Sequence, residues 1–156
     1  MPSLPLDGGC HCGAIRYQLT RAPFLVYNCH CMNCQKISAS VFGTALTIPA
    51  GGIAVICGNS RRFEWESDVG SRRFGEFCGD CGTRLWHGMI PDGKTLSLRA
   101  GTLDETGWLQ PVADFWTDSA QSWVTFAENR LRYSKQPQST DYPIMMEAFR
   151  ALGQFD

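Results

Sequence analysis

The stretch YNCHCMNCQK, at residues 27–36, holds three closely spaced cysteines: Cys29, Cys31 and Cys34. Two cysteines suffice for a disulfide, and four complete a closed tetrahedral zinc site. Three thiolates instead leave the fourth coordination position of a zinc ion free for water or another ligand, as a catalytic zinc requires. The stretch therefore predicts an open metal site, around which the rest of the fold is arranged.

Five further cysteines lie outside this stretch: Cys10, Cys12, Cys57, Cys78 and Cys81. Cysteines spaced C-x-C are too close for a relaxed disulfide, and the clustered cysteines are odd in number. These spacings favour metal binding, and thiolate sulfur selects zinc or an iron–sulfur cluster over hard cations. Zinc is the favoured metal, because a tetrahedral sulfur site needs only short cysteine pairs of this kind. Cys57, in the apolar run IAVIC, is expected to be a small buried hydrophobic residue.

The clustered thiols divide naturally into a set of four and a set of three. The most economical division joins the first and last pairs into a closed, structural zinc site: Cys10, Cys12, Cys78 and Cys81. Cys29, Cys31 and Cys34 then form an open, catalytic site, which gives two Zn2+ per chain. A conventional zinc ribbon between the two C-x-x-C pairs is the alternative, and it would leave the other clustered cysteines without a metal. The spacing alone leaves both divisions open.

Two histidines, His11 and His30, each lie between two cysteines of a cluster. Adjacent side chains of an extended segment point to opposite faces, so a histidine between two ligands is expected to point away from the metal. Either histidine could still act near the open site as a hydrogen-bonding or proton-transfer group. His87, in LWHGM, is expected to be structural.

The remaining sequence predicts a mainly β fold of small antiparallel sheets around the zinc sites. In GAIRYQLT, at residues 13–20, Ile15, Tyr17 and Leu19 alternate with polar residues, which is the period of a half-buried strand. Further β-rich runs lie between turn residues, at 24–27, 42–48, 53–57, 61–66, 72–77, 95–100 and 123–126. Sixteen glycines and eight prolines in 156 residues support this turn-rich arrangement.

One helix is expected near the C-terminal end, in DYPIMMEAFRALG at residues 141–153. Asp141 or Tyr142 can cap this helix, and a proline in its first turn and a glycine at its end agree with the assignment. An apolar stripe at helical spacing is expected to dock on the core: Ile144, Ala148 and Leu152, with Met145 and Phe149. The polar segment before the helix reads as a linker, so we predict a zinc domain at 1–135 and a linker with the helix at 136–156. A short helical turn is expected at 33–40.

The charge balance and the apolar runs narrow the function classes. A formal net charge of −1 without a basic stripe counts against nucleic-acid binding. No signal-peptide pattern and no apolar run of about 20 residues occurs, so we expect a cytoplasmic protein that does not bind membranes. In that reducing compartment, clustered cysteines more often bind metal than form disulfides. A homodimer is the candidate assembly.

Three motifs occur in a fixed order: GGCHCGAIRY at 8–17, CHCMNCQK at 29–36 and FCGDCGTRLW at 77–86. Together they resemble the glutathione-dependent formaldehyde-activating enzyme family, which includes centromere-protein-V-like proteins, over residues 6–126. The resemblance implies the same division of ligands, structural for the four outer cysteines and catalytic for Cys29, Cys31 and Cys34. It also implies small β sheets like those of the small Rab-binding zinc chaperones. AQSWVTF, at 120–126, resembles the family's tryptophan-containing closing strand, and the terminal helix lies beyond the shared core.

The resemblance implies a zinc-dependent carbon–sulfur lyase or synthase that joins glutathione to formaldehyde, giving S-(hydroxymethyl)glutathione. A thiol at the open position would lose its proton and, as a thiolate, attack a small carbonyl carbon. A zinc hydrolase or lyase acting on another small adduct is one alternative. A non-catalytic zinc module, closed by a fourth protein ligand such as His30, is another.

Glutathione would need cations for its carboxylates and a wall of apolar side chains around it. The candidate cations are Lys36, Arg72, Arg73 and Arg84, although surface cations are usually only solvated. The candidate aromatic walls are Trp65, Trp86, Trp116 and Trp123, although aromatic residues at strand spacing are more often part of the core.

Overall fold

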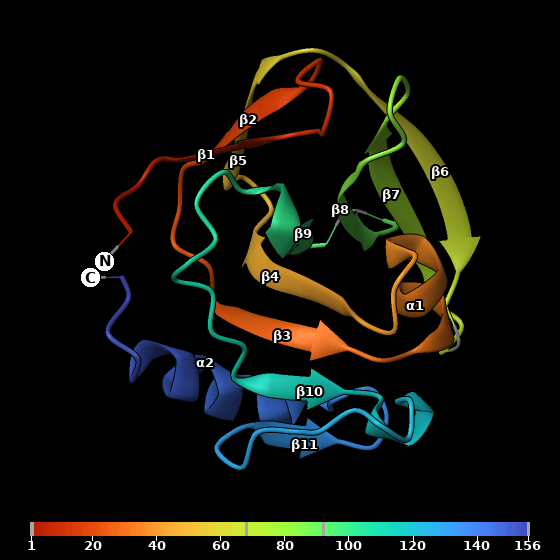
Figure 1. Cartoon of the computed structure of the whole chain (residues 1–156), viewed down its shortest axis with the longest axis vertical. Coiled ribbons are helices and arrows are strands. Elements are labelled where there is room, and N and C mark those ends of the chain that lie inside the picture. Colours follow the sequence, from red (N-terminus) through yellow and green to blue (C-terminus); the bar gives the residue numbers. More distant parts are fainter. Residues whose placement is uncertain (1, 68, 92, 156) are drawn as a thin grey trace.

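The computed structural model describes residues 2–67, 69–91 and 93–155, and within them the chain forms two β sheets and two α-helices (Figure 1). The smaller sheet has the strand order β1-β2-β5, with β1 at Leu6–Gly9, β2 at Arg16–Leu19 and β5 at Ile53–Cys57. The larger sheet has the order β11-β10-β3-β4-β9-β8-β7-β6. Its strands are β3 (Leu25–Cys29), β4 (Gly43–Pro49), β6 (Ser60–Glu66), β7 (Arg72–Cys78), β8 (Arg84–Met89), β9 (Thr95–Arg99), β10 (Ala113–Phe115) and β11 (Leu131–Tyr133). The helices are α1 (Met32–Ser38) and α2 (Tyr142–Arg150), and short 3-10 turns lie at Ala100–Thr102, Thr117–Ser119 and Ser139–Asp141.

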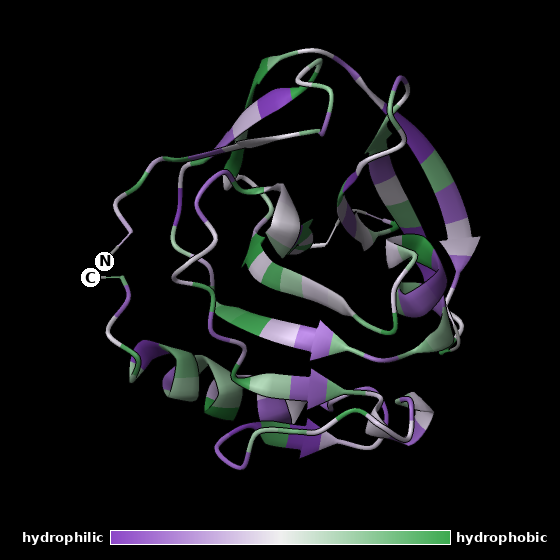
Figure 2. Cartoon of the chain, viewed as in Figure 1, coloured by the Kyte–Doolittle hydropathy of each residue, from purple (hydrophilic) through white to green (hydrophobic). Residues whose placement is uncertain are grey.

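The prediction of a mainly β fold is confirmed. The alternation in 13–20 appears in β2, where Tyr17 and Leu19 are buried while Arg16 and Gln18 are half-buried. Figure 2 shows a similar alternation as bands of hydropathy along β6. The predicted runs at 24–27, 42–48, 53–57, 61–66, 72–77 and 95–100 each coincide with a strand.

The short strand β10 pairs in parallel with both β3 and β11, whereas the other pairs of neighbouring strands in the described residues are antiparallel. This pairing sets Asp114 opposite Asn28 and Phe115 opposite Cys29. The end of the cysteine-bearing strand β3 is therefore held by a segment that lies far along the chain. The sequence did not predict β10 because three residues are too few to show a period.

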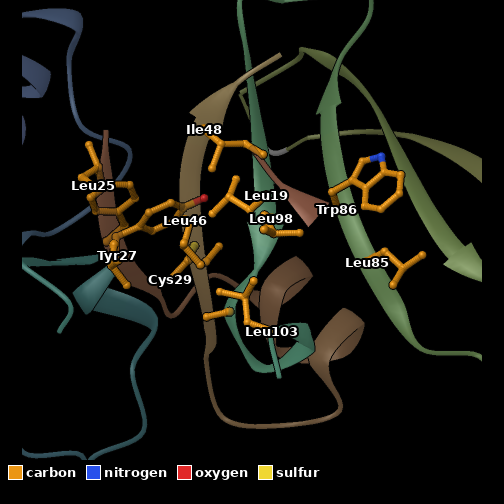
Figure 3. Close-up of a cluster of buried hydrophobic side chains, with 14 of the residues drawn as sticks. Leu19, Leu25, Tyr27, Cys29, Leu46, Ile48, Leu85, Trp86, Leu98 and Leu103 are labelled. Carbon is orange, nitrogen blue, oxygen red and sulfur yellow. The ribbon is translucent and has the colours of Figure 1, made fainter. Parts of the chain in front are cut away.

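The hydrophobic core lies between the two sheets. In the larger sheet, Leu46 of β4, Leu98 of β9 and Trp86 of β8 stand in register on one face. Tyr17 of the smaller sheet meets the Trp86 ring edge-on, with 5.8 Å between ring centroids. Figure 3 shows Leu19 beside Leu46, Ile48 and Leu98 in the middle of the cluster, with Leu25, Leu85 and Leu103 toward its edges. Each fully buried leucine here contributes about 1.5–3 kcal/mol through the hydrophobic effect.

The opposite face of the larger sheet is polar. Tyr27, Ala45 and Arg99 stand in register across β3, β4 and β9. Because side chains alternate along a strand, Arg99 points away from the core leucine that precedes it. Ser97 and His87 form the next row of the same face. This polar face carries the candidate site.

Helix α2 packs against β3, as predicted for the C-terminal helix, but not through the whole of the expected stripe. Met145 and Phe149 are buried, whereas Ile144 is 57% exposed and Leu152 is 38% exposed. The apolar residues of this helix are more numerous than one contact face needs, so their spacing alone could not show which side docks. The predicted short helix at 33–40 is confirmed by α1.

Two other predictions are wrong. Residues 123–126 form no strand, and Trp123 is 68% exposed. Cys57 is exposed instead of buried, because β5 is an edge strand of the small sheet and its far end lies beyond the core. None of the helices in the described part of the chain combines the length and apolar character needed to cross a lipid bilayer.

Candidate active site and metal centres

The structure brings the clustered cysteines together as two separate groups. One group is Cys10, Cys12, Cys78 and Cys81, and the other is Cys29, Cys31 and Cys34. Within each group the sulfur atoms all lie within 4.8 Å of one another. The zinc ribbon considered as the alternative would combine members of both groups, and the described geometry does not bring them together.

The group of four joins two tight turns from the two sheets. In the first turn, the Ile15 amide donates to the Cys10 sulfur at 3.2 Å, and Gly13 adopts a φ of +80°. In the second turn, the Gly82 amide donates to the Cys78 carbonyl, and Gly82 adopts a φ of +75°. Only glycine takes up this left-handed conformation without strain, so each glycine lets the chain fold back after its cysteines.

The sulfur spacing in the group of four fits zinc. Four sulfurs bound tetrahedrally at about 2.3 Å from a zinc ion lie about 3.8 Å apart. The sulfur atoms of Cys10 and Cys12 are 3.5 Å apart, and those of Cys12 and Cys78 are 3.8 Å apart. Four thiolates fill a tetrahedral shell, so this group suits a structural metal.

The group of three is placed by the end of β3 and the start of α1. Cys29 is the last residue of β3, and Cys31 is the N-cap residue of α1. The Cys31 sulfur accepts a hydrogen bond from the Cys34 amide at 3.3 Å. The helix start therefore fixes Cys31 and Cys34 relative to one another, and the strand end adds Cys29 beside them.

The electrostatics of these three thiols favour a bound cation. Hydrogen bonds from Cys29 and Cys31, and then the positive charge of Arg99, lower the pKa of Cys34 to about 3. The hydrogen bonds to Cys31 and Cys34 raise the pKa of Cys29. One thiol therefore ionises at the expense of its neighbours, since adjacent negative charges repel. A divalent cation would allow all three to be thiolates, and sulfur donors suit zinc.

His30 lies between the ligands Cys29 and Cys31 but points away from them, as predicted. Its Nε2 is 3.1 Å from Asp114 Oδ1, and both side chains are 1% exposed. The Asn28 side-chain amide also donates to Asp114 Oδ1, at 3.1 Å, and Arg130 pairs with Asp114 at 3.2 Å. Burial alone would raise the pKa of Asp114, but the hydrogen bonds from His30 and Asn28 and the charge of Arg130 lower it overall. This network anchors the residues on either side of Cys29 to β10.

A cavity of about 360 Å³ opens beside the group of three. The sheet supplies Tyr27, Ser97, His87 and Arg99, and α1 supplies Asn33 and Ile37. Volumes of this order are typical of sites for small molecules. All three cysteines of the group line the cavity, so the group borders a space that can hold a ligand.

The far wall of the cavity comes from the C-terminal part of the chain. Trp116 Nε1 donates to Gln136 Oε1 at 3.4 Å, and Gln136 Nε2 donates to the Tyr142 hydroxyl at 3.1 Å. These three side chains line the cavity together. Trp116 has a φ of 58°, which is unusual for a residue other than glycine and is typical of backbone held in place at functional sites.

The residues expected to bind substrate are only partly found at the cavity. Arg73, Trp65 and Trp116 line it. Arg72 forms a surface ion pair with Glu64 at 2.8 Å. Arg84 stacks over the Phe63 ring at 4.1 Å.

The other expected residues lie elsewhere in the fold. Trp86 belongs to the core and Trp123 to the surface. Lys36 is in the last turn of α1 and is not among the residues that line the described cavity. His11 is exposed beside the group of four, where its amide donates to Thr83.

Two residues of the cavity were not predicted. His87 was expected to be structural, yet it lines the cavity, and burial followed by the charges of Arg99 and Arg84 lowers its pKa well below the usual value. Arg99 is 7% exposed and reaches the cavity from β9. The sequence TLSLRA contained a signal for Arg99, because Thr95, Ser97 and Arg99 alternate with leucines and therefore share the polar face of the strand.

The comparisons with known proteins agree with the cysteine geometry. The sequence profile described as glutathione-dependent formaldehyde-activating enzyme matches residues 5–119, well over half of the chain. A Halomonas elongata protein provisionally named as such an enzyme is 31% identical over 88 residues. That match takes in 52% of this chain and 54% of the relative, so it spans about half of the relative's length. A crystal structure of a Rhodobacter sphaeroides protein aligns with a TM-score of 0.52 and 20% identity, over 68% of this chain and 92% of that chain. This last likeness concerns the fold alone.

Proposed function

The chain belongs to the glutathione-dependent formaldehyde-activating enzyme family, and from this premise we propose that it is a zinc-dependent carbon–sulfur lyase or synthase. The proposed reaction joins a thiol such as glutathione to a small aldehyde such as formaldehyde, or releases them again. Cys29, Cys31 and Cys34 are the proposed catalytic metal ligands. The remaining group of four is proposed to hold a structural zinc, which gives two Zn2+ per chain.

The observation that carries this proposal is the position of the three-cysteine group in the cavity wall. Its sulfur atoms lie within 4.8 Å of one another and all three residues line the 360 Å³ cavity. Three thiolates leave one position of a tetrahedral metal for a ligand from that cavity. A zinc ion there would lower the pKa of an incoming thiol, so that the thiol reacts as a thiolate.

The side chains around the cavity position the substrates and exclude water. Tyr27 donates to or accepts from Ser97 at 3.0 Å, which holds both hydroxyls at the sheet floor. The wall formed by Trp116, Gln136 and Tyr142 covers the cavity from the other side. A thiol and an aldehyde held between them would react as neighbours, which removes much of the entropy cost of bringing them together.

The non-catalytic alternative receives no support from the geometry. It requires a fourth protein ligand to close the group of three, and His30 was the expected one. His30 instead directs its Nε2 to Asp114 and is absent from the groups of potential metal ligands in the described residues. A zinc hydrolase is also disfavoured, because three anionic thiolates make a bound water less acidic than neutral ligands would.

The cytoplasm is the proposed location, because all eight cysteines are free and thiolate ligands persist where thiols are kept reduced. The homodimer stays a prediction.

The test is exchange spectroscopy by NMR on formaldehyde and glutathione, with and without the zinc-loaded protein. The adduct forms spontaneously, so accelerated exchange between free and bound formaldehyde is the signature of catalysis. Wild-type protein with two zinc ions is expected to accelerate this exchange. A wild-type protein that carries two zinc ions and gives no acceleration would discard the named reaction.

The Cys31→Ser variant tests whether the activity depends on the open site. Serine is itself a preferred N-cap residue, so α1 should keep its start while one sulfur ligand is lost. We expect one zinc per chain by metal analysis and no acceleration of exchange. Cys57→Ser removes an exposed cysteine outside both groups and should keep two zinc ions and full activity. Two zinc ions retained in Cys31→Ser would contradict the ligand assignment.

A further inference from the structure

Arg99 is a buried cation whose hydrogen-bond donors are largely unused in the described residues. Its side chain is 7% exposed, and none of its three guanidinium nitrogens has an oxygen or nitrogen acceptor within range. A buried charge without a hydrogen-bonded partner is costly, so such a group is retained where something binds to it. The neighbouring Cys34 sulfur attracts the guanidinium and accepts a hydrogen bond from it, but one sulfur cannot satisfy the five N–H donors of an arginine.

The position of Arg99 is next to the three-cysteine group. A side chain on Gly43 would collide with Arg99 Nη1, and its Cβ would also lie 3.7 Å from the Cys34 Cβ. The guanidinium and Cys34 therefore face one another across the space that glycine leaves empty. Arg99 stands on the cavity face of β9, so its donors reach the space beside the sulfur atoms.

No acidic side chain is available to pair with Arg99 in the cavity. Among the described residues that line it, none is an aspartate or a glutamate, and Arg73 and His87 are the other basic ones. An oxygen acceptor for the remaining donors of Arg99 would therefore enter with the substrate. Arg99 is adjacent to Cys34, so this acceptor must lie close to the substrate sulfur and not at a distant end of the molecule.

We propose that Arg99 is a catalytic residue whose guanidinium binds the oxyanion that forms on the aldehyde carbon when the substrate thiolate adds to it. The inference rests on the proposed function. In this step a sulfur lone pair forms the S–C bond, the C=O π bond breaks, and its electron pair moves to oxygen. Arg99 donates hydrogen bonds to that oxygen, which then takes a proton from water. Donors aimed at charge that develops during the reaction are among the largest contributions to catalysis.

The aldehyde oxygen fits the position beside Arg99 better than the carboxylates of a thiol such as glutathione do. The reacting oxygen is bonded to the same carbon as the sulfur, so it stays near Cys34. The carboxylates are many bonds from the sulfur and would reach farther from Cys34, and Arg73 is another basic residue that lines the cavity. Arg99 and Arg73 thus have separate roles that different thiols can distinguish.

The test compares two small thiols that carry oxygen at the same spacing from sulfur. Mercaptoacetate presents a carboxylate oxygen and 2-mercaptoethanol presents a neutral hydroxyl. Their dissociation constants are measured by calorimetry on protein that holds two zinc ions. The ratio of the two dissociation constants is compared across variants, so that the different acidities of the two thiols cancel.

The wild-type ratio is expected to favour mercaptoacetate, and Arg99→Met is expected to reduce that preference about tenfold or more. The affinity of Arg99→Met for 2-mercaptoethanol should stay near that of wild type. Arg73→Met is the matched control and should keep the wild-type ratio. If Arg99→Met fails to fold or to hold two zinc ions, Arg99→Gln, which keeps a polar side chain without the charge, takes its place.

Two results would overturn the assignment. Equal weakening of both thiols in the Arg99 variant would show that Arg99 only balances the charge of the cysteines. A wild-type protein whose ratio matches that of the Arg99 variant would show that Arg99 does not reach the oxygen. A wild-type protein that shows the preference without accelerating formaldehyde exchange would overturn the named reaction and keep the anion site of Arg99.

Discussion

Removal of the Asp114 carboxylate should destabilise the protein strongly although Asp114 touches neither the cavity nor a cysteine of the two groups. Asp114 is 1% exposed and accepts from Asn28 and His30, each at 3.1 Å, while Arg130 pairs with it at 3.2 Å. In Asp114→Ala, buried donors of Asn28 and His30 lose their acceptor, and an unpaired buried donor costs about 1–3 kcal/mol. Loss of one partner of a buried charge pair typically costs about 3–5 kcal/mol in total. We expect a loss of that size in the free energy of unfolding.

The measurement is urea unfolding of zinc-loaded protein at fixed zinc concentration. With a urea slope of about 1–3 kcal/mol per molar, this loss lowers the unfolding midpoint by about 1 M or more. Asp118→Ala is the matched control, because Asp118 is exposed in the same segment and should change stability by less than about 0.5 kcal/mol. The zinc affinity of the open site should fall as well, by about 10–100-fold, as it does when groups that orient metal ligands are removed. An Asp114→Ala protein within 1 kcal/mol of wild type would refute the network as an anchor for β3.

Two further substitutions test the packing of the site and of the C-terminal helix. Gly43→Ala places a methyl group against Arg99 Nη1, so it should lower the free energy of unfolding in urea by about 1–3 kcal/mol. Gly51→Ala is the control and should not lower it, because no atom lies within 4 Å of the added carbon. Equal effects of the two substitutions would count against a close approach of Arg99 to Gly43. Met145→Ala should lower the free energy of unfolding by about 2–5 kcal/mol because Met145 is fully buried. Ile144→Ala should leave it within about 0.5 kcal/mol of wild type, because Ile144 is exposed. The opposite order would mean that the helix docks through its other side.

The group of three could be predicted from sequence because it depends on short-range spacing. Cys29, Cys31 and Cys34 lie within one strand end and one helix start, and their separation in the chain already brings them together. The most economical division of the remaining cysteines also agrees with the two groups that the structure forms. Most strands were predictable for the same reason, since alternation of side chains is a local property.

The rest of the site could not be predicted because it depends on contacts between distant segments. The pairing of β10 with β3 and the position of Arg99 behind Gly43 follow from sheet register, which the sequence does not show. Cys57 was placed in the core because apolar composition does not distinguish a central strand from an edge. Residues 123–126 were placed in a strand on their β-rich composition and on the resemblance to a family strand, although the segment is irregular and Trp123 is exposed.

The parallel pairing of β10 with β3 has a consequence for the order in which the two cysteine groups become complete as the chain is synthesised. Synthesis proceeds from the N-terminus, so the N-terminal residues of a domain are available first. The last cysteine of the group of four is Cys81, so that group can assemble once the first half of the chain is present. The group of three has all its sulfurs earlier, but its anchor Asp114 and the partner Arg130 emerge much later. The three sulfurs are therefore all synthesised before the strand that fixes their position.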